Sequence, residues 1–392
     1  MTGDRGPLSD ILVVDLSRVL AGPYCTMILG ELGARVIKVE RPAGGDDARH
    51  IGPFLEAADG RRVSAYFAGL NRGKESIALD LAEADDREIF EALLARADVL
   101  VENFRPGVMA RLGYGWETLR TRHPRLVYAA VSGFGQTGPY RDRAAYDLVV
   151  QAMGGIMSIT GHPGGPPTRV GTSIGDIAAG LFAAVGIVAA LHDRARSGRG
   201  RLVDVAMLDG QVAILENAIA RHEATGVVPG PLGARHPSIT PFAAFRAQDG
   251  HLVIAAGNDG LFARLADVLG HPEWRSDARF ASNEARTAHE AALHAAIETA
   301  LAEAPAAVWL ERLGAAGIPC GPINDVAAVL ADPQVQARNM VVTAEDPVAG
   351  PMRMAGNPVK MSDAPDAPTR RPAPALDADR ARILADLGIA AG

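Results

Sequence analysis

The first 131 residues alternate between short apolar runs and longer amphipathic segments, and this alternation constrains the fold more than any other feature. A short continuous apolar run is typical of a strand buried on both faces of a sheet. Alternation of such strands with helices places the strands parallel, with helices on both faces. We therefore predict an α/β fold with a largely parallel sheet. The predicted strands are residues 11–16, 34–40, 76–81, 98–102 and 125–131, and the predicted helices begin near residues 21, 85, 107 and 116.

Basic residues recur beside glycines in the loops at one edge of this predicted sheet. Ligands of such sheets bind outside the carboxyl ends of the strands, where these loops lie. Arginine and lysine donate charge-assisted hydrogen bonds to phosphate oxygens, and glycine lets a ligand approach the backbone. A single loop arginine is more often solvated, but the cluster as a whole predicts a polyphosphate pocket. Its members are Arg41 with residues 42–49, residues 71–74, residues 103–107 and Arg111.

Glu40 raises the possibility of a dinucleotide-binding enzyme. It ends the second predicted strand, where such enzymes place the acid that holds a ribose hydroxyl. However, the turn at residues 15–23 contains no Gly-x-Gly-x-x-Gly motif, which would bring the pyrophosphate onto a helix N-terminus. The missing motif argues against a nicotinamide oxidoreductase.

Asp176 is a lone carboxylate before the most apolar segment, residues 177–191, which offers it no cation. Two interpretations are open. Asp176 can cap a helix by accepting hydrogen bonds from the free N–H groups of the first turn. Alternatively, the helix N-terminus keeps the carboxylate ionised, and it acts as a covalent nucleophile. The apolar run spans ~22 Å as a helix, less than the ~30 Å of a bilayer core, so we expect a buried core helix.

The composition fits an enzyme of two or three domains. At 392 residues the chain exceeds one typical domain. The net charge of −7 is spread widely, which argues against a general nucleic-acid or anionic-membrane binder. Cys25 and Cys320 lack a metal-like spacing and favour a reducing compartment. Because the N-terminus has no apolar signal sequence, we expect a cytoplasmic protein.

The second half of the chain predicts a smaller α+β domain. Residues 201–207 predict a further strand, and one long helix is expected from residue 208 to about residue 225. The composition changes at residues 226–233, which indicates a linker. A hairpin across Gln248-Asp-Gly follows. The remaining predictions are hairpin strands at 242–246 and 251–256, helices near 259–269, 285–303 and 306–314, strands near 340–343 and 352–354, a proline-rich arm at 363–374 and a helix from 377.

Seven motifs follow one another between about residue 9 and residue 390. They are residues 20–24, 33–42, 71–74, 101–107, 132–139, 175–176 and 317–322. Together they resemble the family III CoA-transferases (the CaiB/BaiF family), relatives of formyl-CoA transferase and carnitine CoA-transferase. The resemblance implies an interlocked homodimer in which each ring-shaped subunit is threaded through the other. It also implies a large Rossmann-like CoA-binding domain from residues 1–200 and 351–392, a linker strand and helix at 201–235, a small α+β domain at 236–322 and a return linker at 323–350.

The resemblance implies the chemistry as well. In this family the aspartate aligned with Asp176 attacks the donor acyl-CoA and forms a mixed anhydride. CoA thiolate then gives an aspartyl-CoA thioester, from which the acceptor acid takes the CoA. The implied substrates are therefore an acyl-CoA and a small carboxylic acid, with no tightly bound cofactor, metal, nucleic acid or membrane. The implied contacts with CoA are Val19, Ala21, Arg41, Lys74, Asn103, Phe104, Val108 and Arg111.

Departures from the family pattern bear on the substrate. Formyl-CoA transferase has glutamine in place of Leu20, and its glycine-rich lid is missing between residues 235 and 260, so oxalate or formate specificity is not expected. The family's α-methylacyl-CoA racemases use histidine in place of Tyr146, and tyrosine, with a pKa near ~10, is a poor base at neutral pH. A racemase and a non-catalytic CoA-binding homologue are the alternatives. Tyr146, Arg235 and His236 are candidates for holding the acceptor, such as succinate or a related dicarboxylate.

Overall fold

The computed structural model describes residues 6–57, 59–364 and 366–390, which form two compact units. The first unit contains the described residues up to Met157, the segment Arg169–Val227 and the chain from Pro333 onward. The second unit contains Ser158–Thr168 and Val228–Asp332. The chain therefore leaves the first unit and returns to it, and that unit is built from both ends of the chain.

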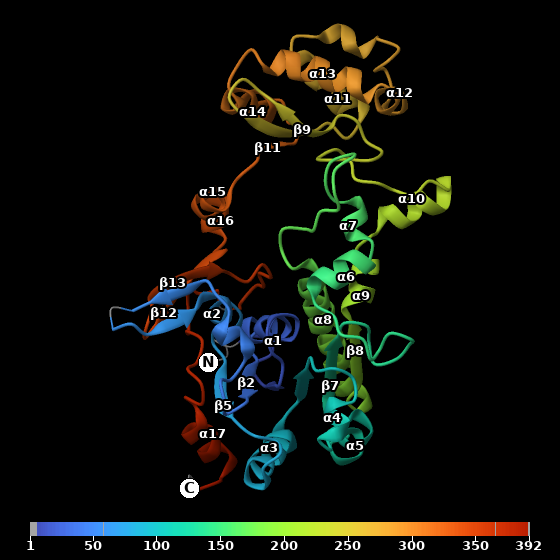
Figure 1. Ribbon diagram of the computed structural model, residues 1–392. Coiled ribbons are helices and arrows are strands. Elements are labelled where there is room, and N and C mark those ends of the chain that lie inside the picture. The colour runs from blue at the N-terminus through green and yellow to red at the C-terminus, as the bar shows by residue number, and fades with distance from the viewer. Residues whose placement is uncertain (1–5, 58, 365, 391–392) are drawn as a thin grey trace. The chain divides into compact units, whose positions relative to one another are not determined.

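The first unit is organised around a six-stranded sheet in the order β5-β2-β1-β6-β7-β8, and all five pairings are parallel (Figure 1). This confirms the predicted parallel α/β sheet. The chain builds one half of the sheet outward from β1 and then crosses back to β6 for the other half. A crevice forms at such a reversal of strand order. The strands are β1 (Leu12–Asp15), β2 (Arg35–Glu40), β5 (Glu75–Ala78), β6 (Val99–Glu102), β7 (Val127–Ser132) and β8 (Leu202–Ala206).

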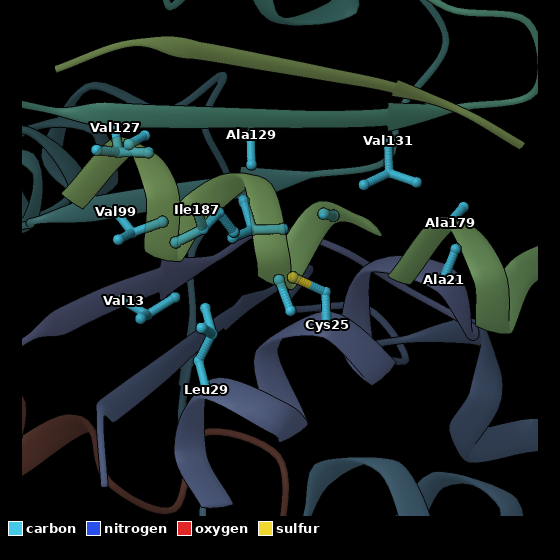
Figure 2. Close-up of a cluster of buried hydrophobic side chains, with 14 of the residues drawn as sticks. Val13, Ala21, Cys25, Leu29, Val99, Val127, Ala129, Val131, Ala179 and Ile187 are labelled. Atoms are coloured by element: carbon cyan, nitrogen blue, oxygen red, sulfur yellow. The ribbon is translucent and has the colours of Figure 1, made fainter. Parts of the chain in front are cut away.

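Helices cover both faces of this sheet, which explains why its strands are apolar without a break. Neighbouring residues of one strand enter different cores. Val13 on β1 and Val99 on β6 pack with α1 (Ala21–Glu31) and α8 (Ile174–Ser197), as Figure 2 shows. Val14 and Leu100 join the core on the other face. Successive strand side chains point to opposite faces, so both sets must be apolar. The helices in the second core are α3 (Ala84–Arg96), α4 (Val108–Arg111), α5 (Trp116–Arg122) and α17 (Arg380–Leu387).

Small residues let α8 lie close to its neighbours. A Cβ atom on Gly180 would be 2.7 Å from the carbonyl oxygen of Ala21 on α1, and one on Gly186 would be 2.6 Å from Val203 Cγ1 on β8. Only glycine permits such an approach. The tight packing places Gly180, which is about one turn after Asp176, beside Ala21 at the start of α1.

The other face of α8 is exposed, so the expectation of a wholly buried helix is wrong for that face. Val185 is 67% exposed, and Leu181, Phe182 and Val188 are exposed beside it. By length and composition alone, the 24-residue helix could cross a membrane. The same properties belong to core helices of soluble proteins, and Ala179, Ala183 and Ile187 of α8 are fully buried.

Two predicted long helices are each divided in the structure. The helix expected over residues 208–225 is broken at Glu216, whose φ of 43° lies in the left-handed region, into α9 (Met207–Ala213) and α10 (Asn217–Thr225). The helix expected over residues 285–303 is divided at His289 into α12 (Asn283–Ala288) and α13 (Glu290–Leu301). Apolar periodicity continues across both breaks, so the pattern alone did not reveal them.

The second unit contains a three-stranded antiparallel sheet in the order β11-β10-β9. The predicted hairpin is confirmed as β9 (Phe242–Arg246) and β10 (His251–Ala255), and β11 (Cys320–Pro322) adds a strand that was not predicted. Leu252, Leu293 and Trp309 are buried in one core of this unit. Its other helices are η2 (Pro272–Arg275), α11 (Asp259–Val268), α14 (Ala306–Ala315) and α15 (Val326–Ala331).

The C-terminal segment protects the free edge of the large sheet. Ala78 N–H on the edge strand β5 donates to Asp377 Oδ1 at 2.7 Å, and Ser76 N–H donates to Asp379 Oδ2 at 2.9 Å. These bonds satisfy backbone groups that an open edge would leave unpaired. The remaining described elements are η1 (Asp47–His50), β3 (Phe54–Glu56), β4 (Arg62–Ser64), α2 (Ala65–Asn71), α6 (Asp147–Met153), α7 (Ile156–Ile159), α16 (Pro333–Ala337), β12 (Val341–Asp346), β13 (Gly350–Ala355) and β14 (Thr369–Arg370).

Candidate active site

A cleft of about 710 Å³ lies beyond the carboxyl ends of β1, β2, β5 and β6. Its lining comes from the segments that directly follow these four strands, as the parallel topology requires. The walls are both apolar and charged. The lining residues include Ser17, Arg18, Arg41, Asp46, Phe104, Arg105 and Val108.

Three of the residues predicted to contact CoA line this cleft: Arg41, Phe104 and Val108. Arg41 is exposed and pairs with Asp47 at 2.7 Å. Two further arginines line the cleft: Arg105 belongs to the basic cluster predicted at residues 103–107, whereas Arg18 was not predicted as a site residue. Arg18 lies in the turn at residues 15–23, so a count of the arginines in every carboxyl-end loop would have found it.

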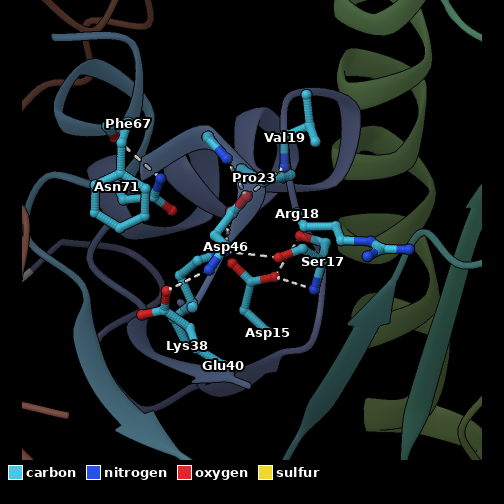
Figure 3. Close-up of polar contacts among 12 residues, drawn as sticks. Asp15, Ser17, Arg18, Val19, Pro23, Lys38, Glu40, Asp46, Phe67 and Asn71 are labelled. Carbon is cyan, nitrogen blue, oxygen red and sulfur yellow. Dashed lines mark hydrogen bonds and ion pairs between the residues drawn. The ribbon is translucent and has the colours of Figure 1, made fainter. Parts of the chain in front are cut away.

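Neighbouring side chains hold the turn after β1 at the edge of the cleft (Figure 3). Asn103 accepts a hydrogen bond from Arg18 N–H at 2.9 Å and donates one to Arg18 C=O at 2.8 Å. Asp46 Oδ1 accepts from Val19 N–H at 3.0 Å, and Lys38 Nζ donates to Ser17 C=O at 2.6 Å. Val19 has a φ of 66°, which is unfavourable for a β-branched residue. The surrounding bonds therefore hold a strained turn in one conformation.

The remaining predicted CoA contacts have different positions. Val19 belongs to the strained turn, Ala21 begins α1, and Asn103 acts on the turn as described. Arg111 is exposed at the end of the short helix α4, one turn beyond Val108. None of these four residues is among those that line the cleft.

Lys74 lies outside the cleft lining, and its ammonium group is buried. Its Nζ lies 2.7 Å from Thr26 Oγ1, 2.9 Å from Asn71 Oδ1 and 3.0 Å from Asp15 Oδ2. Burial lowers the pKa of Lys74 to about 8, against the effect of Asp15. Burial alone would raise the pKa of Asp15, but Lys74 and then Lys38 outweigh it and hold that pKa at about 2. With three acceptors for its three N–H bonds, Lys74 has none to offer a phosphate.

Glu40 is not available to a ribose hydroxyl. Its carboxylate accepts from Asp46 N–H at 3.0 Å, from Ser76 Oγ at 2.7 Å and from two nitrogens of Arg49 at 2.8 Å each. A carboxylate has about four acceptor positions, and these donors fill them. Glu40, the residue that raised the possibility of a dinucleotide-binding enzyme, therefore has a structural role.

Asp176 is the third residue of α8 and not its cap. The helix begins at Ile174, and Gly175 N–H donates to Asp147 Oδ1 at 2.8 Å. The capping interpretation was thus wrong, because Asp147, which begins α6, supplies the carboxylate for this turn. Among the residues that the structure describes, none donates a hydrogen bond to the Asp176 carboxylate. Burial, and to a smaller extent the charge of Asp147, raises the pKa of Asp176 to about 7.

The expectation that the helix N-terminus keeps Asp176 ionised is corrected by this environment. A half-buried carboxylate without a donor or a cation loses hydration that nothing replaces. Near neutral pH, Asp176 therefore exists in both protonated and ionised forms. The ionised form is a stronger nucleophile than an ordinary aspartate, because basicity and nucleophilicity rise together.

Asp147 belongs to a buried polar cluster next to Asp176. Its second oxygen, Oδ2, accepts from Gln151 Nε2 at 2.8 Å, and Gln151 Oε1 accepts from Val170 N–H at 2.9 Å. Gln151 is fully buried and so fixes the segment before α8 to α6. Arg169 Nη2 lies 3.6 Å from Asp147 Oδ2.

Tyrosines flank the site in different ways. Tyr146, predicted as a substrate contact, is the N-cap residue of α6 and is 79% exposed. Tyr66, on α2, was not predicted. Burial raises the pKa of Tyr66 to about 12, and Asp176, Asp46 and Asp147 add to the rise. Tyr66 therefore lies within electrostatic range of both Asp176 and the cleft residue Asp46, although its only sequence signal is that α2 leads into the motif at residues 71–74.

Arg235 and His236, the other predicted acceptor contacts, lie in the second unit, whereas Asp176 lies in the first. His236 N–H donates to Phe242 C=O at 2.8 Å, and its Nδ1 accepts from Ser238 N–H at 3.1 Å. These bonds fix a loop beside β9. Across residues 6–57, 59–364 and 366–390, no three His, Cys, Asp or Glu side chains are grouped to hold a metal.

A family model described as CoA-transferase family III matches residues 8–380. The chain is 50% identical over 380 residues to the acetyl-CoA:oxalate CoA-transferase of Acetobacter aceti, covering 97% of this chain and 95% of that one. It is 42% identical over 389 residues to the succinate–glutarate CoA-transferase of Agrobacterium fabrum, covering 99% and 97%. It is 40% identical over 392 residues to the succinyl-CoA:mesaconate CoA-transferase of Haloarcula hispanica, covering 99% and 98%.

Solved structures have the same fold. A CaiB/BaiF family protein from Brucella suis is 41% identical, with a TM-score of 0.85 over 98% of this chain and 100% of that one. A protein from Mycobacterium tuberculosis is 32% identical, with a TM-score of 0.86 over 97% and 99%. These similarities extend over both units of the chain.

Proposed function

The chain belongs to CoA-transferase family III, and on that basis we propose that it transfers CoA from an acyl-CoA to a small dicarboxylic acid through a covalent intermediate on Asp176. That it is a CoA-transferase acting on CoA thioesters follows from the family. The nucleophile, the acceptor class and the dimer are the parts proposed here. The observation that carries the proposal is the half-buried Asp176 carboxylate, which has a raised pKa and no hydrogen-bond donor.

The proposed reaction has four steps. The Asp176 carboxylate attacks the acyl carbon of the donor, so the C–S bond breaks, CoA leaves as thiolate and a mixed anhydride forms. The thiolate attacks the Asp176 carbonyl, which releases the donor acid and gives an aspartyl-CoA thioester. The acceptor carboxylate attacks this thioester and forms a second anhydride with release of thiolate. The thiolate finally attacks the acceptor carbonyl, which yields the new acyl-CoA and restores the Asp176 carboxylate.

The cleft beyond β1, β2, β5 and β6 is the proposed site for the nucleotide end of CoA. Arg18, Arg41 and Arg105 provide charge-assisted donors for phosphate oxygens along its walls. Phe104 provides an aromatic surface on which an adenine ring can stack. The charges of Asp46 in the cleft and of Asp176 both raise the pKa of Tyr66, and this shared neighbour relates the cleft to the proposed nucleophile.

The relatives support a dicarboxylate as acceptor. Their names specify oxalate, succinate with glutarate, and mesaconate, and each of these acids carries two carboxylates. Oxalate belongs among the acids to test despite Leu20 and the missing lid, because the relative named for it is 50% identical. No observation favours the racemase, since Tyr146 stands in place of the histidine and is 79% exposed.

The proposed assembly is the interlocked, cytoplasmic homodimer that the family resemblance implies. Its support is the exposed apolar face of α8 together with Leu148, Val149 and Met153 on α6. A large exposed apolar patch marks an interaction surface, and a second copy would cover it. Light scattering of the purified protein should give twice the mass of the 40.9 kDa chain.

The test of the nucleophile is chemical trapping. The protein is incubated with succinyl-CoA and then with hydroxylamine or borohydride, and the modified residue is identified by peptide mass spectrometry. The adduct should be on Asp176, and an adduct on any other residue would refute the mechanism. Asp176→Ala should lower kcat by at least about a thousandfold and leave CoA binding within about twofold. Asp142→Ala, which removes an 80% exposed acid nearby in the sequence, is the matched control.

A further inference from the structure

Arg169 is the only cation that the described residues place against the acidic pair Asp147 and Asp176. Its Nη2 lies 3.6 Å from Asp147 Oδ2, and no cation contributes to the pKa of Asp176. A dianionic acceptor that approaches Asp176 meets two acidic side chains, Asp176 itself and Asp147. Binding such an acceptor therefore requires a positive charge at the same place.

The backbone beside Arg169 is fixed, and its side chain donates one hydrogen bond, from Nε to the adjacent Val170 C=O at 3.1 Å, which still lets the Nη atoms face another carboxylate. Val170 N–H is held by the fully buried Gln151, which also bonds to Asp147. The Arg169 side chain is 47% exposed. At 3.6 Å, the contact between Arg169 Nη2 and Asp147 is an ion pair without a hydrogen bond. Moving the guanidinium from Asp147 to another carboxylate therefore costs little free energy.

Asp147 stays fully bonded if Arg169 moves away. Its Oδ1 keeps the N–H of Gly175 and its Oδ2 keeps the amide of Gln151. Breaking an internal ion pair is usually costly because it leaves a buried charge without a partner. Here the Asp147 carboxylate keeps its partners, so this cost does not arise. Arg169 can thus exchange Asp147 for another carboxylate at small cost.

We propose that Arg169 selects dicarboxylate acceptors: its guanidinium binds the far carboxylate of an acid whose near carboxylate reacts at Asp176. This inference rests on the proposed function and names the specificity-determining residue of that site. The planar guanidinium presents paired N–H donors that match a carboxylate. Among the described residues Arg169 pairs with Asp147 and not with Asp176, so we expect an acid with one carboxylate to react at Asp176 without using Arg169.

The experiment measures KM and kcat for the acceptor at a fixed concentration of acyl-CoA donor. Succinate and glutarate are compared with acetate and butyrate in the wild type, Arg169→Gln, Arg169→Lys and the control Arg143→Gln. Arg143 is an exposed arginine whose guanidinium lies 3.9 Å from the centre of the Tyr140 ring, and it has no role in the site. Loss of a charge-assisted bidentate contact should raise KM for the dicarboxylates by about 10- to 100-fold.

Several further readings follow from the same data. KM for the monocarboxylates should change by less than about twofold, kcat should stay within about threefold, and Arg169→Lys should restore part of the dicarboxylate affinity. Equal changes for both classes of acid, or a fall in kcat alone, would overturn the inference, because Arg169 would then act only through Asp147. A wild type that binds acetate more tightly than succinate would also overturn it. The proposed function fails separately, if the wild type transfers CoA to none of these acids or if the trapped adduct is not on Asp176.

Discussion

Replacing Asp147 by asparagine should make the nucleophile titrate at a lower pH. The asparagine side chain keeps an oxygen for Gly175 N–H, so the first turn of α8 keeps its cap, while the negative charge beside Asp176 is removed. Burial is the larger cause of the rise in the pKa of Asp176 from 3.8 to about 7, so Asp147 contributes less than half of that rise. We therefore expect the pKa of Asp176 to fall by about one, which equals about 1.4 kcal/mol in favour of the ionised form.

The assay is the pH dependence of CoA release from the donor, measured as kcat/KM between pH 5 and pH 9 with a thiol reagent. Only the ionised carboxylate attacks, so the rate falls as pH decreases through the pKa of Asp176. With a pKa of about 7 in the wild type and about 6 in the variant, the ionised fraction at pH 6 rises about fivefold. The rate at pH 6 relative to the rate at pH 8.5 should rise by the same factor, and the high-pH rate should fall a few-fold because the weaker base is a weaker nucleophile.

The control for this prediction is Asp142→Asn, which removes a charge from an 80% exposed acid in the loop before α6. Screening by solvent should leave its profile unchanged. If the acidic limb of Asp147→Asn stays at the wild-type position, or moves to higher pH, then Asp147 does not raise the pKa of Asp176 and the electrostatic account of the site is refuted.

Three further predictions concern stability and CoA binding. Asp176→Asn should stabilise the fold by a few kcal/mol at pH 8 and by much less at pH 4. The pKa of Asp176 is higher in the folded state, so the wild type loses stability as pH rises from about 4 to about 7, whereas the variant does not. Urea unfolding at both pH values checks this, and equal stabilisation at both would contradict it. Asn103→Ala removes both hydrogen bonds to the Arg18 peptide and should raise KM for the acyl-CoA by about tenfold with kcat nearly unchanged, whereas an unchanged KM would show that the strained turn does not position the substrate. Lys74→Met leaves the buried Asp15 carboxylate without its nearest cation and should cost about 3–5 kcal/mol in urea unfolding; a variant of normal stability with weaker CoA binding would instead make Lys74 a ligand contact.

The parallel sheet could be predicted because each of its strands has apolar residues on both faces. Val13 and Val14 enter different cores, as do Val99 and Leu100, and this continuous pattern is visible in the sequence. The position of the basic loops follows directly, because parallel strands bring their carboxyl ends to one edge. The confirmed predictions therefore depend on short-range patterns and on a general rule of topology.

The sequence also identified Asp176 as a candidate nucleophile, but the sequence alone could not predict the hydrogen bonds and charges around this carboxylate. Residue type and the preceding glycine fit a helix cap, yet the hydrogen bond that caps α8 comes from Asp147, 28 residues earlier. The exposed face of α8 was hidden in the same way, because an apolar helix that packs on one side only has the composition of one buried all round.

By itself, then, the sequence determined the α/β class, the parallel strands, the edge on which the loops gather and the residue types available there. Only the tertiary structure decided which charged groups are bonded within the protein. The Glu40 carboxylate accepts hydrogen bonds from Arg49, Ser76 and a backbone N–H, and the Lys74 ammonium donates one to Asp15. The Arg169 side chain, in contrast, remains half-exposed. The physical reason is the range of the forces. Strand and helix patterns arise between residues close in sequence, whereas the partner, burial and pKa of a charged group depend on side chains that folding brings from distant parts of the chain.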